Sequence, residues 1–187
     1  MRSILDLSMK IKKCNLCRGL YVDKPCIIHR IYDKYLPSKP LVFVVSESPP
    51  PGFKQDYLYN NFQKDNLRIV LSRIFNIDER DVIEYLVKKH VFWSTAVKCR
   101  PLYSDRNKKN KYVEIMRRNC REILSYEINV LKPEITIALG NVALKSFREI
   151  GLKPDFQAYH PLYYRRIGDL DKLKRLFNEV FESIGLI

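Results

Sequence analysis

The sequence LVFVVSESPPPGF at Leu41–Phe53 predicts a buried strand that ends abruptly in a polar turn. Its first five residues, Leu41–Val45, are all apolar. A short run without a polar position is typical of a strand that is covered on both faces. Ser46, Glu47 and Ser48 follow, and then three prolines. Because proline fixes φ and restricts the residue before it, we expect Glu47 to lie in a rigid loop directly after this strand.

Three further apolar runs have the character of strands: Val91–Val97, Glu134–Leu139 and a weaker run at Phe156–Tyr159. The segments between the runs carry apolar residues at helical spacing. The predicted helices cover Leu67–Phe75, Val82–Val87, Ile115–Leu131 and Leu170–Ile184, and Met1–Lys13 has the pattern of an amphipathic helix. This alternation predicts an α/β fold, a three-layer αβα sandwich around a central, mostly parallel four-stranded sheet. No repeat or linker interrupts the chain, so residues 1–187 are expected to form a single domain.

One residue of functional interest stands at or just after the end of each predicted strand. These residues are Glu47, Thr95, Gly140 and His160. In parallel sheets with helices on both faces, ligands bind beyond the carboxyl ends of the strands, so the four residues are expected to surround a site. The sequence alone also allows Glu47 to be a solvated loop carboxylate, and His160 to satisfy only a backbone carbonyl.

Basic residues greatly outnumber acidic ones in this chain. Lys and Arg total 34, Asp and Glu total 21, and the formal net charge is +13. Such an excess favours a polyanionic partner, nucleic acid first and an acidic membrane surface second. A Lys-rich surface of the thermophile type is the alternative, although such surfaces usually gain Glu together with Lys.

The chain has no sequence signal for a membrane or for secretion. No apolar run approaches the ~20 residues of a membrane span. Met1–Lys13 lacks an apolar stretch followed by a small-residue cleavage site. We therefore expect a cytoplasmic protein without a membrane partner, and nothing in the sequence predicts an oligomer, so a monomer is expected.

Five cysteines occur, and two of them form the pair Cys14-Asn15-Leu16-Cys17. A two-residue spacing lets both thiolates bind one metal centre, and disulfides are not expected in a reducing cytosol. Cys99 and Cys120 are the expected further ligands, whereas Cys26 is interpreted as a buried apolar residue. Both zinc and a four-iron cluster accept four thiolates, and spacing does not separate them.

Several motifs, in order along the chain, resemble the iron–sulfur uracil-DNA glycosylases of thermophilic archaea and bacteria, family 4 with family 5 close by. The motifs are Cys14-x-x-Cys17, TAVKCRP at Thr95–Pro101, Cys120, LKPEITIALGNVAL at Leu131–Leu144 and YHP at Tyr159–Pro161. The resemblance implies that Cys14, Cys17, Cys99 and Cys120 hold a structural [4Fe–4S] cluster, with zinc as the alternative.

The resemblance also assigns roles around the expected site. The family carries a Gly-Glu-x-Pro-Gly loop, which here reads Ser46-Glu47-Ser48-Pro49-Pro50 and retains the Glu and the first Pro. An aromatic residue that stacks on the extruded base follows in the family. The candidates are Tyr57, Tyr59 and Phe53, of which Tyr59 fits best by spacing, and Ser46 is expected beside the base. His160 would contact the departing base, and Leu162 would fill the gap in the duplex.

Thr95 occupies the position at which the family has a base-reading Asn, four residues before Cys99. An Asn amide offers one acceptor and two donor hydrogens, whereas a Thr hydroxyl offers one donor on a shorter arm. This change puts uracil as the preferred base in question. Several basic residues are expected to contact DNA phosphates. They are Arg100, Lys108, Lys109 and Arg165.

The sequence therefore favours a monofunctional DNA glycosylase of base excision repair that extrudes uracil or another deaminated base and hydrolyses the N-glycosidic bond. Glu47 would stabilise the sugar cation or orient water, and His160 would donate a hydrogen bond to the leaving base. The first alternative is an inactive iron–sulfur protein that binds nucleic acid. A hydrolase of small molecules on the same fold is the third possibility, and the charge of +13 argues against it.

Overall fold

The four predicted strands form one parallel sheet in the order β2-β1-β3-β4. The computed structural model describes residues 3–103 and 106–186. The strands are β1 (Val42–Ser46), β2 (Val91–Thr95), β3 (Ile135–Leu139) and β4 (Phe156–Ala158). Ser46 pairs with Thr95, Val45 pairs with Ala138 and Leu139 pairs with Ala158, so the carboxyl ends of the strands are level across the sheet. The predicted α/β class is confirmed, with all pairings parallel.

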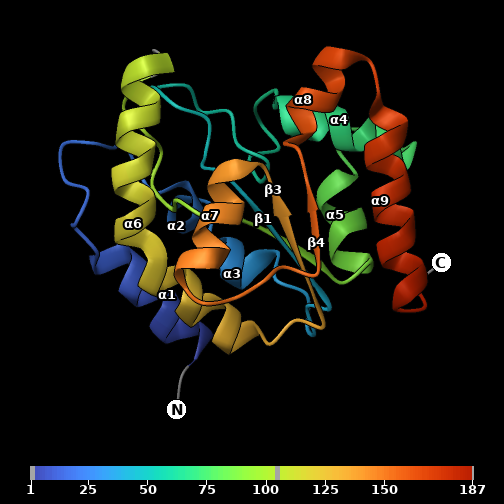
Figure 1. The fold of residues 1–187 in the computed structure, drawn as a ribbon, viewed down its shortest axis with the longest axis horizontal. Helices are drawn as coiled ribbons and strands as arrows, with labels where there is room; N and C mark the ends of the chain where they lie inside the picture. The colour runs from blue at the N-terminus through green and yellow to red at the C-terminus, as the bar shows by residue number, and fades with distance from the viewer. Residues whose placement is uncertain (1–2, 104–105, 187) are drawn as a thin grey trace.

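Helices cover both faces of this sheet (Figure 1). The first group is α1 (Ile4–Lys13), α6 (Arg106–Leu131) and α7 (Asn141–Glu149), which contact one another on one side. The second group is α4 (Asn66–Phe75), α5 (Val82–Lys88), α8 (Pro161–Ile167) and α9 (Leu170–Ser183) on the opposite side. Two short helices, α2 (Pro25–Ile28) and α3 (Ile31–Lys34), connect α1 to β1.

The helices begin where the sequence supplies caps. Ser3 and Asp6 form a reciprocal capping box at α1. The Asp65 side chain accepts the backbone N–H of Arg68 at 2.8 Å and so caps α4. Pro161, whose φ is already helical, is the first residue of α8. These caps fix the entrances of α4 and α8, which both lie beside the carboxyl ends of the strands (Figure 1).

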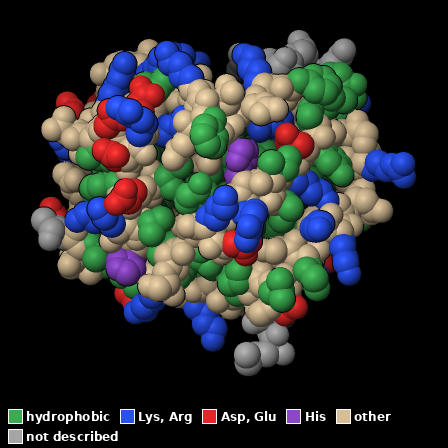
Figure 2. Space-filling view, turned by 180° about the vertical axis from the view of Figure 1, so that it is seen from behind, with side chains coloured by type: hydrophobic (Ala, Val, Ile, Leu, Met, Phe, Trp, Pro, Cys, Tyr) green, Lys and Arg blue, Asp and Glu red, His purple; other side chains and the backbone are tan. Residues whose placement is uncertain are grey.

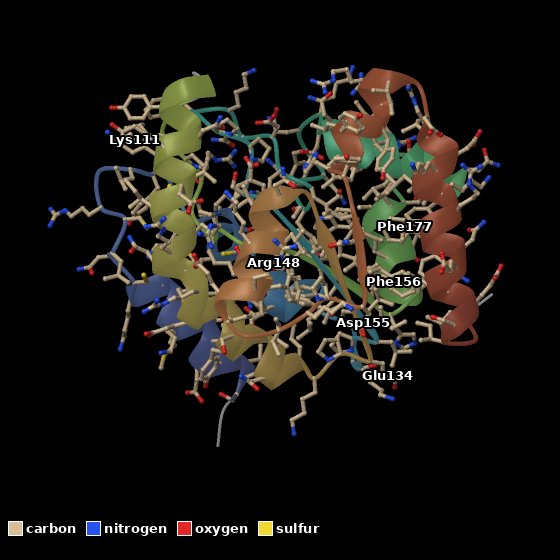
Figure 3. All side chains as sticks on the ribbon, viewed as in Figure 1. Lys111, Glu134, Arg148, Asp155, Phe156 and Phe177 are labelled. Carbon is tan, nitrogen blue, oxygen red and sulfur yellow. The ribbon has the colours of Figure 1, made fainter. Side chains whose placement is uncertain are left out.

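The core consists of the sheet and the apolar faces of its covering helices. Val42, Phe43, Val44 and Val45 are completely buried, as the unbroken apolar run predicts. Phe177 points from α9 toward the sheet (Figure 3) and stacks on Trp93 with ring centroids 6.1 Å apart. Burial of each large apolar side chain contributes about 1.5–3 kcal/mol to folding, so such contacts hold the layers together.

The two ends of the sheet differ in chemistry. Glu134 and Asp155 lie at the amino ends of β3 and β4 (Figure 3). There the Asp155 carboxylate accepts the Thr136 N–H and hydroxyl, each at 2.8 Å, which ties the two strands together. The opposite, carboxyl end carries the site described below. No helix in the described ranges is both long and apolar enough to cross a membrane.

Candidate active site

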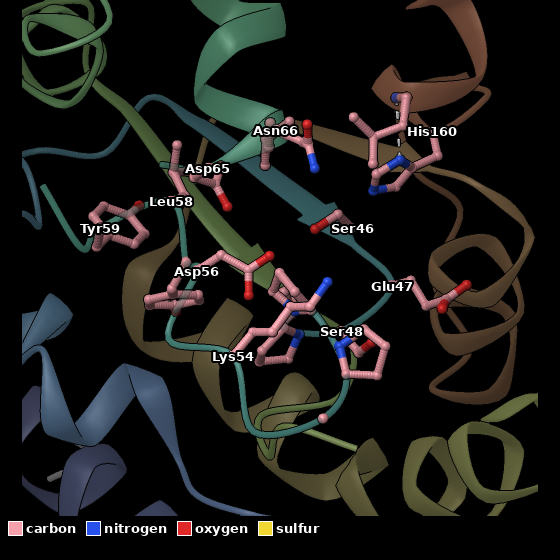
Figure 4. Close-up of a pocket in the computed structure, with 18 of the residues that line it drawn as sticks. Ser46, Glu47, Ser48, Lys54, Asp56, Leu58, Tyr59, Asp65, Asn66 and His160 are labelled. Atoms are coloured by element: carbon pink, nitrogen blue, oxygen red, sulfur yellow. Dashed lines mark hydrogen bonds between the residues drawn. The ribbon is translucent and has the colours of Figure 1, made fainter. Parts of the chain in front are cut away.

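A cavity of about 770 Å³ opens at the carboxyl ends of the strands (Figure 4). Its walls come from the loop after β1, the start of α4, the end of β2 and the start of α8. Eight residues predicted from the sequence line it: Ser46, Glu47, Phe53, Tyr57, Tyr59, Thr95, His160 and Leu162. The sheet topology thus brings together residues more than a hundred positions apart in the chain.

The backbone around Glu47 is held by the neighbouring strand. The Glu47 carbonyl accepts the N–H of Val97 at 3.0 Å, and the Ser46 carbonyl accepts the N–H of Ala96 at 2.8 Å. Ser46 itself is buried, and its hydroxyl accepts the indole N–H of Trp93 at 3.2 Å. Glu47 is half-buried and lies along the same side of the cavity as His160, with Ser46 between them (Figure 4).

His160 caps α8 with its own side chain. The Nδ1 atom accepts the backbone N–H of Leu162 at 3.3 Å. In a neutral imidazole the other nitrogen, Nε2, then carries the proton and acts as a donor. Gly140 lies behind this residue with φ +91°, and a Cβ at that position would stand 3.6 Å from the His160 Cβ. The bond from Leu162 favours the tautomer of His160 with the proton on Nε2, and Pro161 restrains the backbone beside it.

Tyr57 and Tyr59 border the cavity from within an aromatic cluster. Tyr59 stacks on Tyr35 at 5.3 Å, and its hydroxyl donates to the Trp93 carbonyl at 2.8 Å while accepting the Trp93 N–H at 3.1 Å. Burial raises the phenolic pKa of both tyrosines. They expose only 5% and 4% of their surface, so a stacked base would meet a ring edge or one small area of face.

The Thr95 side chain lines the cavity, but its hydroxyl proton is already used in a hydrogen bond within the protein. Its Oγ1 donates to the backbone carbonyl of Val97 at 2.7 Å. A hydroxyl carries a single hydrogen, so toward a ligand the Thr95 oxygen can only accept. At this position, where the resemblance implies an amide with two donor hydrogens, the Thr95 side chain therefore offers no donor.

The structure adds cavity residues that the sequence did not single out. Lys54 and Asp56 enter from the proline-rich loop, and Asp65 and Asn66 enter from the start of α4. The Asn66 side-chain oxygen accepts a hydrogen bond from Arg165 at 2.8 Å. An Asp-Asn pair before an apolar helix is a detectable cap signal. Nothing in the sequence indicates that this cap faces Ser46 and His160.

Arg100 does not lie on the surface, which corrects its predicted contact with phosphate. Only 1% of the residue is exposed, and its guanidinium pairs with Asp23 at 3.0 Å. It also donates to the backbone carbonyls of Pro50 at 2.9 Å and Asp56 at 3.0 Å. Because it bonds to both arms of the loop after β1, Arg100 shapes the cavity wall from behind.

The other predicted DNA contacts fall in different places. Arg165 is exposed and bonds to Asn66 at the cavity rim, and Leu162 is 38% exposed beside His160. The side chains of Lys108 and Lys109 lie outside the residues that the structure describes. A phosphate contact by Arg165 and a wedge role for Leu162 therefore stay predictions.

Four cysteines approach one another on the α1–α6 side of the fold. The segment after Cys17 runs along Cys99, since Val22 donates to the carbonyl of Arg100 at 2.9 Å and Leu102 donates to that of Leu20 at 2.9 Å. Burial raises the pKa of Cys17, Cys99 and Cys120, and neighbouring cysteines raise each value further. Cys14 is among those neighbours for Cys17 and Cys120.

The donor chemistry of these cysteines fits a thiolate-bound metal centre. Four mutually repelling thiolates need a cation to stay ionised together. Asn119 also donates to the Cys17 sulfur at 3.4 Å, which is a typical bond to a ligand sulfur. Within residues 3–103 and 106–186, no three His, Cys, Asp or Glu side chains stand at metal-binding distance. Cys26 is directed elsewhere, toward the Lys98 carbonyl at 3.8 Å.

Comparison with known proteins agrees with this architecture. The model of the uracil DNA glycosylase superfamily matches residues 34–184, which include all four strands and every cavity residue. No curated protein matches the sequence. Cys14 and Cys17 precede the matched region, so the iron–sulfur type stays a prediction. The fold, the cavity and the extent of the match lead to one conclusion: the chain belongs to the uracil DNA glycosylase superfamily.

Proposed function

We propose that this protein is a DNA glycosylase that removes uracil or another deaminated base by hydrolysis of the N-glycosidic bond. The observation that carries the proposal is that Glu47, after β1, and His160, after β4, line one cavity at the carboxyl ends of the strands. Such a site takes a nucleotide that has been turned out of the base stack.

The two residues suit the two charges that develop during this reaction. As the bond between the sugar C1′ and the base nitrogen breaks, the sugar becomes positive and the base becomes negative. Glu47 would face the sugar, stabilise the cation and orient the water that adds to C1′. His160, with Nδ1 held by the Leu162 N–H, would donate from Nε2 to the departing base. A neutral imidazole is sufficient for this role.

DNA is the proposed partner, because the net charge is +13. Figure 2 shows Lys and Arg spread over one face of the molecule, with fewer acidic side chains between them. Binding that relies on phosphate contacts weakens steeply as salt rises. We expect an affinity for a DNA oligonucleotide that falls by at least about tenfold between 50 and 200 mM salt.

A [4Fe–4S] cluster is the proposed cofactor, and Cys14, Cys17, Cys99 and Cys120 would hold it. The support is the thiol chemistry and the electrostatic influence of each cysteine on the others. When bound, the cluster would contribute no redox step and would tie the end of α1 to the segment before α6. Four iron and four sulfide ions per chain, with broad absorbance near ~400 nm, would support the cluster. One zinc ion per chain would instead show that these cysteines bind zinc.

The deciding experiment is a single-turnover assay on oligonucleotides that carry uracil, hypoxanthine, xanthine or a G·T mismatch, in single and double strands. Wild-type protein is compared with Glu47→Ala and His160→Ala. Abasic sites formed by the wild type and reduced by about 10²-fold or more in both variants would support the glycosylase and name its base.

The competing function is a non-catalytic protein that binds nucleic acid. It is favoured by Thr95, whose hydroxyl is committed to Val97 and offers no donor to a base. In the same assay it predicts no product on any substrate, together with tight and salt-sensitive binding to DNA. Catalytic turnover on any one of the four substrates would exclude it.

A further inference from the structure

Asn66 holds a fixed orientation at the rim of the cavity. It is the first residue of α4, directly after the capping residue Asp65. Its side-chain oxygen accepts from Arg165 Nη1 at 2.8 Å. Arg165 belongs to α8, the helix that begins after His160. This contact between two elements orients an exposed side chain at the start of a helix.

The partner decides which end of the amide faces the cavity. A guanidinium has only donors, so the Asn66 atom that meets Arg165 must be the oxygen. The amide nitrogen with its two hydrogens then points the other way, toward Ser46 and the space above Asp56 (Figure 4). Asn66 also lies in the first turn of a ten-residue helix, where the positive end of the helix dipole favours an electron-rich partner.

Asn66 offers the donor hydrogens that the resemblance would place on an Asn at position 95. Thr95 stands where the family places its base reader, but its only hydrogen is bonded to the Val97 carbonyl. Asn66 lines the same cavity and presents two amide hydrogens. Donor hydrogens that Thr95 on β2 lacks are thus present on Asn66 at the start of α4.

We propose that Asn66 reads a carbonyl oxygen of the extruded base, and that Arg165 is a positioning residue for its amide. This inference rests on the proposed glycosylase function and narrows its substrate class. Uracil, hypoxanthine and xanthine carry a carbonyl at the read edge, whereas cytosine and adenine carry an amine there, which would place donor against donor. Through Asn66 the site would thus select uracil over cytosine and hypoxanthine over adenine, whereas guanine, the parent of xanthine, carries the same C6 carbonyl and would not be rejected by this contact.

Asn66→Asp gives the sharpest test, because Asp has the same shape and still accepts from Arg165. It replaces two donor hydrogens with an acceptor that faces the base carbonyl. We expect single-turnover cleavage at uracil to fall by about 10²-fold or more, and the ratio of uracil to cytosine cleavage to fall with it. Asn66→Ala, which removes the contact without adding repulsion, should lose less.

Arg165→Ala tests the positioning role, and Arg166→Ala is its matched control. Both variants remove one exposed positive charge from α8, but Arg166 lies over the Tyr163 ring at 5.3 Å rather than against Asn66. We expect both to weaken DNA binding equally, and only Arg165→Ala to lower the ratio of uracil to cytosine cleavage. Arg165→Lys, which keeps a donor near Asn66, should restore part of that ratio.

The outcomes separate this inference from the function on which it rests. Wild-type cleavage of uracil that is unchanged in Asn66→Asp would overturn the role of Asn66 and leave the glycosylase intact. If the wild type cleaves nothing, the proposed function fails. The role of Asn66 is then tested by equilibrium binding to single strands that carry one uracil or one cytosine. A preference for uracil that Asn66→Asp removes would support the reader, and no preference would overturn it.

Discussion

The two faces of β2 use polar side chains in opposite ways. Trp93 and Thr95 point to the cavity, while Ser94, between them, points to a buried network. In that network Lys98 donates to the Ser94 hydroxyl at 2.8 Å, to the Thr95 carbonyl at 2.6 Å and to the Glu127 carboxylate. Ser94 and Tyr32 also donate to Glu127, at 2.9 and 2.7 Å. Lys98 and Glu127 are 1% and 0% exposed.

Every hydrogen of the Lys98 ammonium group has a partner within the buried network. These polar groups therefore stabilise the fold and are not available to a ligand. On the cavity face, two of the lining side chains each have one anchored atom. His160 is held through Nδ1, and Asn66 is held through its oxygen. The two faces therefore differ in role: the buried network supports the fold, whereas His160 and Asn66 belong to the lining of the cavity.

The largest predicted effect is on stability and comes from the network. Lys98→Met leaves the Glu127 carboxylate buried without its cation, and we expect a loss of about 3–5 kcal/mol in the free energy of unfolding by urea. The double variant Lys98→Met with Glu127→Met removes both charges and should recover most of the loss. A single variant as stable as the double would show that the pair is not a closed unit.

Much of the molecule could be predicted because local patterns determine it. The all-apolar run Leu41–Val45 predicts a covered strand, and the structure confirms β1 one residue further along. The sequence predicts that Glu47 and His160 lie near each other because the ends of parallel strands meet at one edge of the sheet, and the structure places both in the lining of one cavity. Where topology alone positions a side chain, the sequence is sufficient.

The remaining features depend on contacts between distant segments. Arg100 was expected at the surface because it is charged, but Asp23 and the carbonyls of Pro50 and Asp56 satisfy it in the interior. Asn66 gains its orientation from Arg165, 99 residues away. Such pairings depend on packing between helices, and no local spacing in the sequence encodes them.

The next largest effect is expected for Tyr59→Phe, which removes a hydroxyl that is bonded to the backbone of β2. β2 is an edge strand, and the Tyr59 hydroxyl pairs with both the N–H and the carbonyl of Trp93. Loss of this hydroxyl should cost about 1–3 kcal/mol in the free energy of unfolding, because two buried backbone groups lose their partner. The cleavage rate of the folded protein should change less than about threefold, since the ring is retained. A large rate loss without a change in stability would contradict this assignment.

Thr95→Val should have a smaller effect. It tests whether Thr95 stabilises the fold rather than reads the base. Val has the same shape and lacks only the hydroxyl that donates to Val97. We expect a loss of about 1 kcal/mol in the free energy of unfolding and a nearly unchanged ratio of uracil to cytosine cleavage. Thr95→Ser, which keeps the hydroxyl, serves as the control. If Thr95→Val lowered that ratio strongly while Thr95→Ser did not, base reading would return to Thr95.

The smallest predicted effect comes from an ion pair between α6 and α7. Its charges are paired, like those of the buried network, but they are still partly solvated. Arg117, on α6, bonds to Glu114 at 2.7 Å and to Glu149 of α7 at 2.6 Å. The hydrogen bond with Arg117 lowers the Glu114 pKa to about 2, and Arg117 also lowers the pKa of Glu149. Since an unfolded Glu titrates near pH ~4.3, folding favours the ionised form at both positions. Their stabilisation is therefore complete above about pH 5 and is lost as the pH falls toward 2.

The side chains of Glu114 and Glu149 are each 35% exposed, so solvent screening limits the stabilisation by each pair to at most about 1 kcal/mol. Glu114→Gln should reduce the decline of the unfolding free energy between pH 5 and pH 2.5, as measured by urea titration at each pH. Glu122→Gln, an exposed carboxylate further along the same helix, is the matched control. Identical pH profiles for the wild type and Glu114→Gln would mean that solvent screens this pair completely. The stabilising polar contacts would then be confined to the fully buried face of β2.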